Sequence, residues 1–147
     1  MRIESPAVAA RLAELGVELR QGVSLRTLTS LGIGGETDIL LLRRYEGLPE
    51  AISLLKREGI PYRFLGGGTN VLVVDRELPW VMLQLPLAPA TAKIEGNRAY
   101  IDAAADLGGT VTYCAKNNLG GMEGLIGVPG SIGAVSYTHL DVYKRQF

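Results

Sequence analysis

The apolar residues in the first half of the chain predict alternating helices and strands. Over residues 5–16 they recur at helical spacing, and a Ser-Pro pair opens this segment while a glycine closes it. Residues 17–28 are expected to be extended, with polar interruptions. The continuous apolar run 39–42 is typical of a strand covered on both faces. A helical pattern over 48–55 and an apolar run over 62–65 follow, and this strand, helix and strand predict a parallel crossover unit.

The pattern changes after residue 70. Four short apolar segments there predict strands, at 71–74, 80–85, 92–95 and 98–103. Gly96-Asn97 fits a two-residue hairpin turn between the last pair. Asp106 is placed to cap a helix that reaches about Asn118. The expected fold class is therefore α+β, with a small α/β lobe over residues 1–70 and a lobe of antiparallel strands plus helix over residues 71–135.

The composition is that of a globular chain. Of its 147 residues, 47% are hydrophobic and 20% are charged. Lys and Arg balance Asp and Glu at 15 each and form no basic stripe, which disfavours a nucleic-acid partner. Residues 1–5 lack the pattern of a signal peptide, and no apolar stretch reaches the roughly 20 residues that span a bilayer. A cytoplasmic protein without a membrane partner is therefore expected.

The sequence predicts no metal site and no disulfide. Cys114 is the single cysteine and lies in a helical apolar pattern, so we interpret it as a small buried side chain. His139 is the single histidine, and no role is expected for it.

The most informative segment is FLGGGTNVLVVD, residues 64–75, in which an apolar run leads into three consecutive glycines. Each glycine costs backbone entropy, and a shorter turn would connect two strands. The glycines therefore suggest that main-chain N–H groups are turned toward one point, where they can bind an anion such as a pyrophosphate. Thr69 and Asn70 can add side-chain hydrogen bonds. A flexible surface loop remains an alternative interpretation of this segment.

Neither of the common phosphate-binding motifs is present. No Gly-Lys-Ser/Thr follows the glycines, which excludes a nucleoside-triphosphatase loop. Val71 stands where the Rossmann dinucleotide fingerprint needs glycine or alanine, and Thr37 stands there in the earlier run TSLGIGGET. A third glycine-rich run, residues 121–135, contains Pro129-Gly130-Ser131. This turn can place Ser131 as the cap of a helix whose N-terminus faces a ligand, or it can simply be a loop before a helix.

Three of these segments resemble one family in their order and spacing: TSLGIGG, LGGGTNVLV and GLIGVPGSIGAV. They are similar to the N-terminal flavin domain of the UDP-N-acetylenolpyruvoylglucosamine reductase (UDP-N-acetylmuramate dehydrogenase) family. The resemblance runs from about Leu12 to Val135. It implies an FAD-binding fold of the vanillyl-alcohol oxidase type.

The resemblance also implies residue roles. The FAD pyrophosphate is expected at Gly66, Gly67, Gly68, Thr69 and Asn70. The flavin is expected beside Val128, Pro129, Gly130, Ser131, Ile132 and Gly133, and the cofactor is expected close to Ile33, Gly34 and Gly35.

In that family NADPH reduces FAD, and the flavin passes hydride to the enol ether of a nucleotide sugar during peptidoglycan synthesis. The resemblance thus implies an NADPH-dependent oxidoreductase with a small-molecule nucleotide-sugar substrate, expected to be a monomer. The family's serine, glutamate and arginine that assist the reaction, together with its substrate domain, lie beyond the point where the resemblance ends. We therefore assign no catalytic residue, and we expect the chain alone to bind FAD weakly or not at all and to turn over nothing.

Two features depart from the family pattern. Ala103-Ala104-Ala105 stands where the family often has Gly-Ala-Gly, so the space beside the cofactor is expected to be narrower. After Val135 the family pattern stops, and residues 136–147 carry none of its motifs. Our hypothesis is that this tail is foreign sequence, such as translated adapter or cloning DNA, fused to a truncated gene.

Two alternatives stay open from the sequence. An FAD-dependent oxidase of the wider vanillyl-alcohol oxidase superfamily would share the pyrophosphate loop. A non-catalytic α/β module that binds a nucleotide or a protein would also fit a lone glycine loop.

Overall fold

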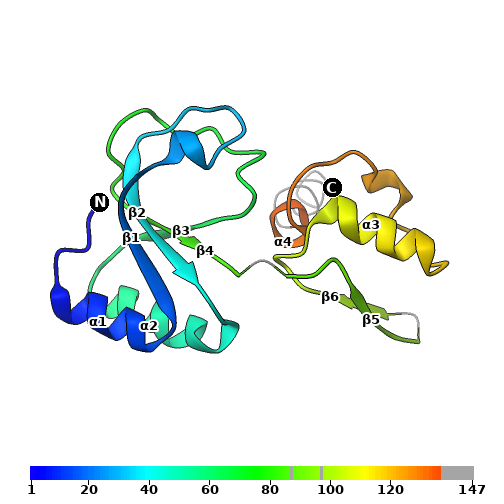
Figure 1. Cartoon of the computed structure of the whole chain (residues 1–147), viewed down its shortest axis with the longest axis horizontal. Coiled ribbons are helices and arrows are strands. Elements are labelled where there is room, and N and C mark those ends of the chain that lie inside the picture. Colours follow the sequence, from blue (N-terminus) through cyan, green and yellow to red (C-terminus); the bar gives the residue numbers. More distant parts are fainter. Residues whose placement is uncertain (87, 97, 137–147) are drawn as a thin grey trace, which may run out of the picture. The chain divides into compact units, whose positions relative to one another are not determined.

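The computed structural model describes residues 1–86, 88–96 and 98–136. The chain divides into two compact units, Met1–Pro86 and residues 87–147 (Figure 1). The first unit thus runs past the boundary expected at residue 70, because the strand at 81–84 belongs to its sheet. Each unit is a mixture of helix and strand, in agreement with the predicted α+β class. Among the described helices, none is long and apolar enough to cross a bilayer.

The first unit is built on a four-stranded mixed sheet with strand order β1-β2-β4-β3. β1 is antiparallel to β2, whereas β2 and β3 both run parallel to β4, which lies between them. The predicted parallel crossover of strand, helix and strand is therefore confirmed, with β4 inserted in its middle. The elements are α1 (Pro6–Glu14), β1 (Val17–Ser24), η1 (Leu25–Thr27), β2 (Glu36–Leu42), η2 (Tyr45–Gly47), α2 (Leu48–Arg57), β3 (Tyr62–Leu65) and β4 (Val81–Gln84).

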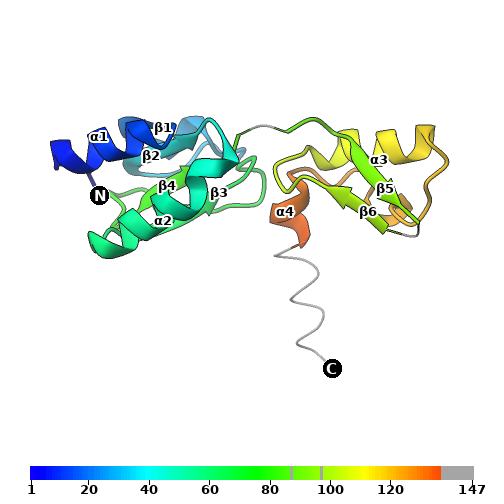
Figure 2. The ribbon, with the colours of Figure 1, turned by 90° about the horizontal axis from the view of Figure 1, so that it is seen from below.

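One face of this sheet is covered by α1 and α2, which lie on the same side of it (Figure 2). Leu12 of α1 and Leu55 of α2 are fully buried against Leu40 and Leu83 of the two central strands. Ser5 caps α1 and Pro6 occupies its first position, as predicted. Burial of these branched side chains supplies most of the stability of the unit, because each removes a large apolar area from water.

The other face of the sheet is covered by loops instead of helices. Leu25, Val73 and Leu78 reach from the connections onto Ile39 and Met82 of the strands. The strand predicted at 71–74 is wrong, because this segment lies in the loop between β3 and β4. Within this segment Val73 is buried between two exposed neighbours, because its side chain enters the core from a loop. The segment itself pairs with no strand.

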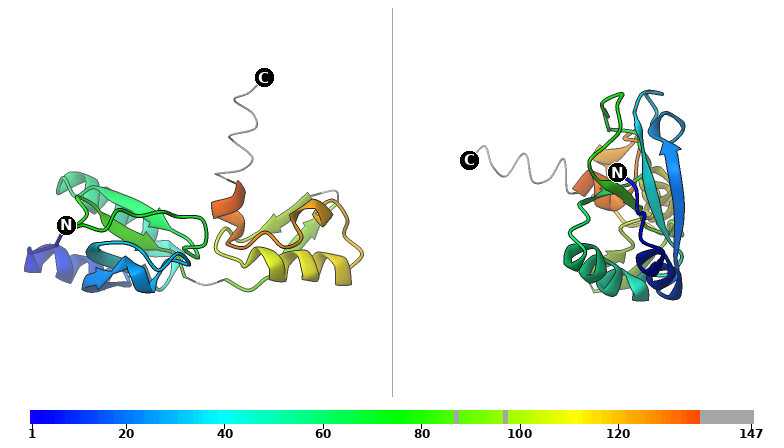
Figure 3. Two further views of the ribbon diagram at one scale, coloured as in Figure 1. Left: turned by 90° about the horizontal axis from the view of Figure 1, so that it is seen from above. Right: turned by 90° about the vertical axis from the view of Figure 1, so that its left-hand side faces the viewer.

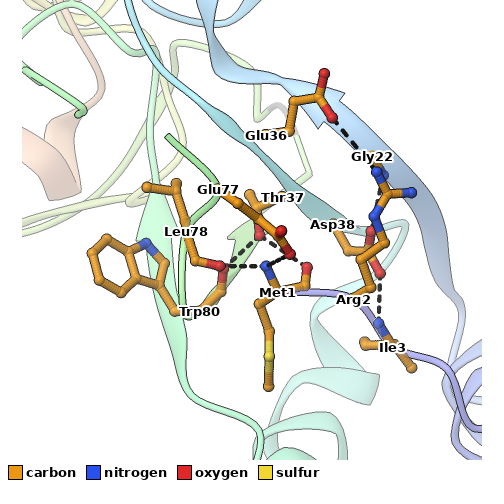
Figure 4. Close-up of polar contacts among 10 residues, drawn as sticks. All are labelled: Met1, Arg2, Ile3, Gly22, Glu36, Thr37, Asp38, Glu77, Leu78 and Trp80. Atoms are coloured by element: carbon orange, nitrogen blue, oxygen red, sulfur yellow. Dashed lines mark hydrogen bonds and ion pairs between the residues drawn. The ribbon is translucent and has the colours of Figure 1, made fainter. Parts of the chain in front are cut away.

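A buried carboxylate fixes the start of the chain to this sheet. Asp38 of β2 is fully buried, and its two oxygens accept the main-chain N–H groups of Ile3 at 2.7 Å and Gly22 at 2.9 Å (Figure 4). Gly22 lies in the bulge of β1, where φ is +60°, a conformation that favours glycine. Two bonds to a charged acceptor compensate for the loss of hydration of the carboxylate.

The second unit contains a hairpin and a helix. β5 (Ala92–Glu95) is antiparallel to β6 (Arg98–Ile101), and α3 (Leu107–Lys116) lies alongside the hairpin (Figure 3). Asp106 caps α3 through the N–H of Gly109 at 2.7 Å, as predicted. Two further short helices follow, η3 (Glu123–Leu125) and α4 (Ile132–Val135). Gly96 has a φ of +56° between the paired strands, and the other residue of the predicted turn, Asn97, lies outside the described residues.

Apolar burial is unequal between the two units. Both clusters of buried apolar side chains found in the described residues belong to the first unit. The buried apolar residues described in the second unit are Ala105, Leu107, Cys114 and Val135. A two-stranded hairpin with so little buried surface is marginally stable, so the first unit is expected to dominate the stability of the chain.

Two sequence-based hypotheses fall on residues that the structure does not describe. The suspected foreign tail, residues 136–147, lies outside the described residues except for Ser136, and so does His139. Cys114 is buried as predicted, with its Sγ 3.6 Å from Sδ of Met122. No metal-binding cluster of His, Cys, Asp or Glu occurs within the described ranges.

Replacing Leu40 by alanine tests the core between the sheet and the helices. The cavity left among fully buried side chains should lower the free energy of unfolding by about 2–5 kcal/mol. Urea denaturation followed by the fluorescence of Trp80, the single tryptophan, measures this for the first unit. Leu72→Ala is the control, because Leu72 is 76% exposed and its loss should change the unfolding free energy by less than about 0.5 kcal/mol. Equal effects of the two substitutions would contradict the assigned core.

Replacing Asp38 by alanine tests the buried carboxylate. Two main-chain N–H groups would lose their acceptor, and the unfolding free energy should fall by about 2–4 kcal/mol. Asp75→Asn serves as control, since the ion pair of Asp75 with Arg26 is exposed and should contribute less than about 1 kcal/mol. The same denaturation experiment compares the two variants, and an Asp38→Ala protein as stable as the control would refute the role of Asp38.

Candidate functional site

Two of the three glycine-rich segments lie against each other in the first unit. The main-chain N–H of Ser30 donates to the carbonyl of Gly68 at 2.9 Å, and the Ser30 hydroxyl donates to the carbonyl of Thr69 at 3.2 Å. Further along, the N–H of Gly35 donates to the carbonyl of Val74 at 2.9 Å. The segment 29–35, here called the first glycine loop, is thus bound along much of its length to the second glycine loop, residues 66–76.

Some glycines of these loops are required by the contact between the loops themselves. A Cβ on Gly35 would lie 1.7 Å from the carbonyl oxygen of Arg76, and a Cβ on Gly68 would lie 1.9 Å from the carbonyl oxygen of Leu28. Gly68 also has a φ of +66°, which disfavours other residues. At these two positions the glycine is needed because another segment of the protein backbone lies against it, and not because a ligand does. Such contacts make the pair of loops a defined structure rather than a flexible surface turn.

Gly66 and Gly67 have a different environment. Both are exposed, as is Asn70, while Thr69 is half-buried. Within the described part of the chain, no protein acceptor is found for the N–H groups of Gly67, Gly68 and Asn70. Neighbouring main-chain N–H groups without a protein acceptor, on a loop held by its own carbonyls, are the chemical basis of an anion site. The residues present therefore fit a diphosphate group.

Exposed apolar side chains occur on both loops beside these amides. Leu31 and Ile33 belong to the first glycine loop, and Leu72 and Val74 to the second. Leu72 is the most exposed of them, at 76%. Apolar surface next to an anion-binding backbone suits a ligand that carries both a phosphate and an aromatic ring. The ring can displace water from the apolar side chains, and the phosphate oxygens can replace water at the main-chain N–H groups.

The third glycine segment lies in the second unit. The carbonyl of Gly130 accepts from the N–H of Leu107 at 2.9 Å, and the N–H of Ile132 donates to the carbonyl of Ala105 at 3.0 Å. The hydroxyl of Ser131 accepts from the N–H of Ala134 at 3.4 Å and so caps α4, as predicted. The described part of α4 is only four residues long, so its N-terminus is a weak source of positive potential. Val128 and Pro129, which precede this cap, are half-buried and exposed, respectively.

The alanine run that departs from the family pattern contacts this segment. The N–H of Gly133 donates to the carbonyl of Ala103 at 2.8 Å, and a Cβ on Gly133 would lie 3.0 Å from the Cβ of Ala103. Ala105 is fully buried. The alanine methyl at position 103 is therefore accommodated within the protein, because its neighbour at position 133 has no side chain.

Sequence reasoning did not identify two residues that shape the site. Ser30 joins the two glycine loops, and its position inside TSLGIGG, shortly before the expected ligand residue Ile33, was the available signal. Asp38 fixes β2 directly after the first glycine loop, and a carboxylate within an apolar run was the signal for it.

The chain is similar to several curated reductases. Over 133 aligned residues it is 36% identical to the UDP-N-acetylenolpyruvoylglucosamine reductase of Myxococcus xanthus (strain DK1622), covering 86% of this chain and 43% of that protein. It is 33% identical to the protein of the same name from Clostridium botulinum (strain Hall), covering 80% of this chain and 39% of the other. The protein of that name from Bacillus velezensis (strain FZB42) is 30% identical, with 84% and 41% covered.

The fold supports the same relationship. A crystal structure of UDP-N-acetylenolpyruvylglucosamine reductase from Thermus caldophilus matches with a TM-score of 0.61 at 32% identity, covering 80% of this chain and 40% of that one. No family model matches the sequence. The chain spans about two fifths of the length of the relatives it matches. Sequence and fold thus agree in making this chain similar to UDP-N-acetylenolpyruvoylglucosamine reductases.

Proposed function

We propose that this chain is the FAD-binding part of an NADPH-dependent reductase that converts UDP-N-acetylglucosamine enolpyruvate to UDP-N-acetylmuramate in peptidoglycan synthesis. The activity is proposed for the full-length parent protein, which we expect to act in the cytoplasm as a monomer. The two units correspond in this proposal to the two subdomains of a flavin-binding fold of the vanillyl-alcohol oxidase type.

The observation that carries the proposal is the second glycine loop. Its carbonyls at Gly68 and Thr69 accept hydrogen bonds from Ser30, while the main-chain N–H groups of Gly67, Gly68 and Asn70 have no acceptor within the described residues. A diphosphate supplies several charged oxygens to such groups, and each bond to a charged acceptor contributes about 1.5–3 kcal/mol. In this proposal Gly66 to Asn70 bind the pyrophosphate of FAD, and Ile33, Gly34 and Gly35 line the cofactor beside it.

The segment from Val128 to Gly133 is proposed to lie beside the flavin ring. Its backbone is held by Ala103, Ala105 and Leu107, so it presents a fixed edge. Bound FAD would supply the hydride-transfer chemistry between NADPH and the enolpyruvyl group. The residues of this chain bind and orient the cofactor, and the exposed apolar side chains of both loops keep water from its rings. The names of the relatives favour this reductase over an oxidase of the wider superfamily and over a non-catalytic nucleotide-binding module.

Replacing Gly67 by alanine tests the diphosphate assignment. Gly67 is exposed, so the methyl group should leave folding intact while it obstructs the approach of phosphate oxygens to the loop. We expect the Kd for FAD of the full-length parent, measured by flavin fluorescence, to rise by about tenfold or more. Gly124→Ala is the matched control, because nothing lies within 4 Å of its added Cβ and its φ is not in the left-handed region. An unchanged Kd in Gly67→Ala would remove the pyrophosphate from this loop.

The proposed reaction is tested separately in the same parent protein. NADPH oxidation should depend on added UDP-N-acetylglucosamine enolpyruvate and should fall in Gly67→Ala to the extent that the FAD content falls. Reconstitution with excess FAD should then restore the rate, because the substitution affects cofactor binding only. NADPH oxidation that is indifferent to the enolpyruvyl substrate would exclude the reductase assignment even if FAD binds.

A further inference from the structure

The geometry points to Ser30 as a positioning residue, one that turns the main-chain amides of the second glycine loop toward the diphosphate of the cofactor. The inference rests on the proposed function, since it concerns the same loop. It adds a residue that touches neither phosphate nor flavin and acts through the carbonyls of Gly68 and Thr69.

The first step concerns the peptide groups that Ser30 holds. The described residues contain no cis peptide bond. In a planar trans peptide the C=O of one residue and the N–H of the next point in opposite directions. Ser30 draws the carbonyls of Gly68 and Thr69 toward itself, with distances of 2.9 and 3.2 Å. The N–H groups of Thr69 and Asn70 therefore point to the opposite side of the loop.

The second step concerns why two successive carbonyls can face the same residue. In an extended strand they would alternate, and one would point away from Ser30. The backbone of Thr69 lies between these two carbonyl groups, and Thr69 is in a turn and not in an extended segment, so the alternation is broken there. Successive N–H groups then converge as well, because each is fixed opposite a carbonyl. Ser30 anchors the two carbonyls, and the turn at Thr69 allows both to face it.

The third step concerns the rigidity of the anchor. Thr29, which precedes Ser30, is buried, and its hydroxyl donates to the carbonyl of Ile33 at 2.9 Å. The carbonyl of Thr29 accepts the N–H of Gly32 at 3.1 Å and closes a turn around Ser30. Ser30 therefore lies in a turn that is stabilised by its own hydrogen bonds. Its position is fixed, and so is the direction in which it holds the carbonyls of the second glycine loop.

The two bonds made by Ser30 can be separated by substitution. The bond from its main-chain N–H to Gly68 survives any side-chain change except proline, whereas the hydroxyl bond to Thr69 is lost in Ser30→Ala. Because Ser30 is exposed, this loss should leave folding almost unchanged. The amide of Asn70, opposite the Thr69 carbonyl, should lose its fixed direction, and affinity for a diphosphate should fall.

The test uses the full-length parent without FAD, with ADP as a diphosphate-carrying probe. Amide resonances are followed by heteronuclear NMR during titration of wild type, Ser30→Ala, Ser30→Thr and Ser53→Ala. Ser53 is the matched control, because it is also exposed and its hydroxyl also donates to a main-chain carbonyl, that of Pro49 at 2.9 Å. Thermal unfolding of each variant, followed by Trp80 fluorescence, checks that the first unit remains folded.

In wild type, ADP should shift the amide resonances of residues 66–70. Ser30→Ala should raise the Kd for ADP by roughly 3- to 10-fold, the effect of one neutral hydrogen bond. Ser30→Thr keeps a hydroxyl and should restore the wild-type Kd, and Ser53→Ala should match wild type. Without ligand, the carbonyl carbon resonance of Thr69 should move in Ser30→Ala and return in Ser30→Thr.

Each other outcome overturns a defined part of this picture. A wild-type response with the same Kd in Ser30→Ala would overturn the role of Ser30 and leave the proposed function intact. A Ser30→Thr protein that binds as weakly as Ser30→Ala would also overturn it, because the hydroxyl would then not be the relevant group. Wild-type amides at 66–70 that ignore ADP would refute the diphosphate site of the proposed function, and the role of Ser30 with it.

Discussion

The close approach of two glycines to main-chain carbonyls of a neighbouring segment is the constraint on which the rest of the first unit depends. Gly35 and Gly68 lie so close to the carbonyls of Arg76 and Leu28 that no side chain fits at either position. Leu25, just before the first glycine loop, and Val73, in the second, belong to the core on the face of the sheet that has no helix. The conformation of the loops is therefore set by the same close packing that covers this face of the sheet. The loops cover the sheet and also form a candidate binding surface.

The local elements of the fold were predictable, because each depends on nearby residues. Ser5-Pro6 and Asp106 specify helix starts, and the apolar run at 39–42 specifies a buried strand. The position of β4 was not predictable in this way, since its place between β2 and β3 is decided by pairing across long stretches of chain. A lone Val73 that enters the core from a loop cannot be distinguished from a strand by alternation alone.

The candidate site was predictable to a similar degree. Glycine runs identified the loops, but they could not distinguish Gly68, which is required by packing, from Gly67, which is exposed. That distinction depends on which backbone lies opposite each glycine, and this is a property of tertiary structure. Ser30 escaped prediction for the same reason, because its partners, Gly68 and Thr69, are remote in sequence and are main-chain atoms that carry no residue-type signal.

The strand order has a consequence for how the second glycine loop can move. This loop joins β3 at the edge of the sheet to β4, which pairs on one side with β2 and on the other with β3. A hinge opening of the loop would have to pull on a strand that is hydrogen-bonded along both edges. The conformational entropy of the loop is thus lost when the sheet forms, before any ligand binds. Ligand binding should therefore use a preformed site and need no closure of the loop.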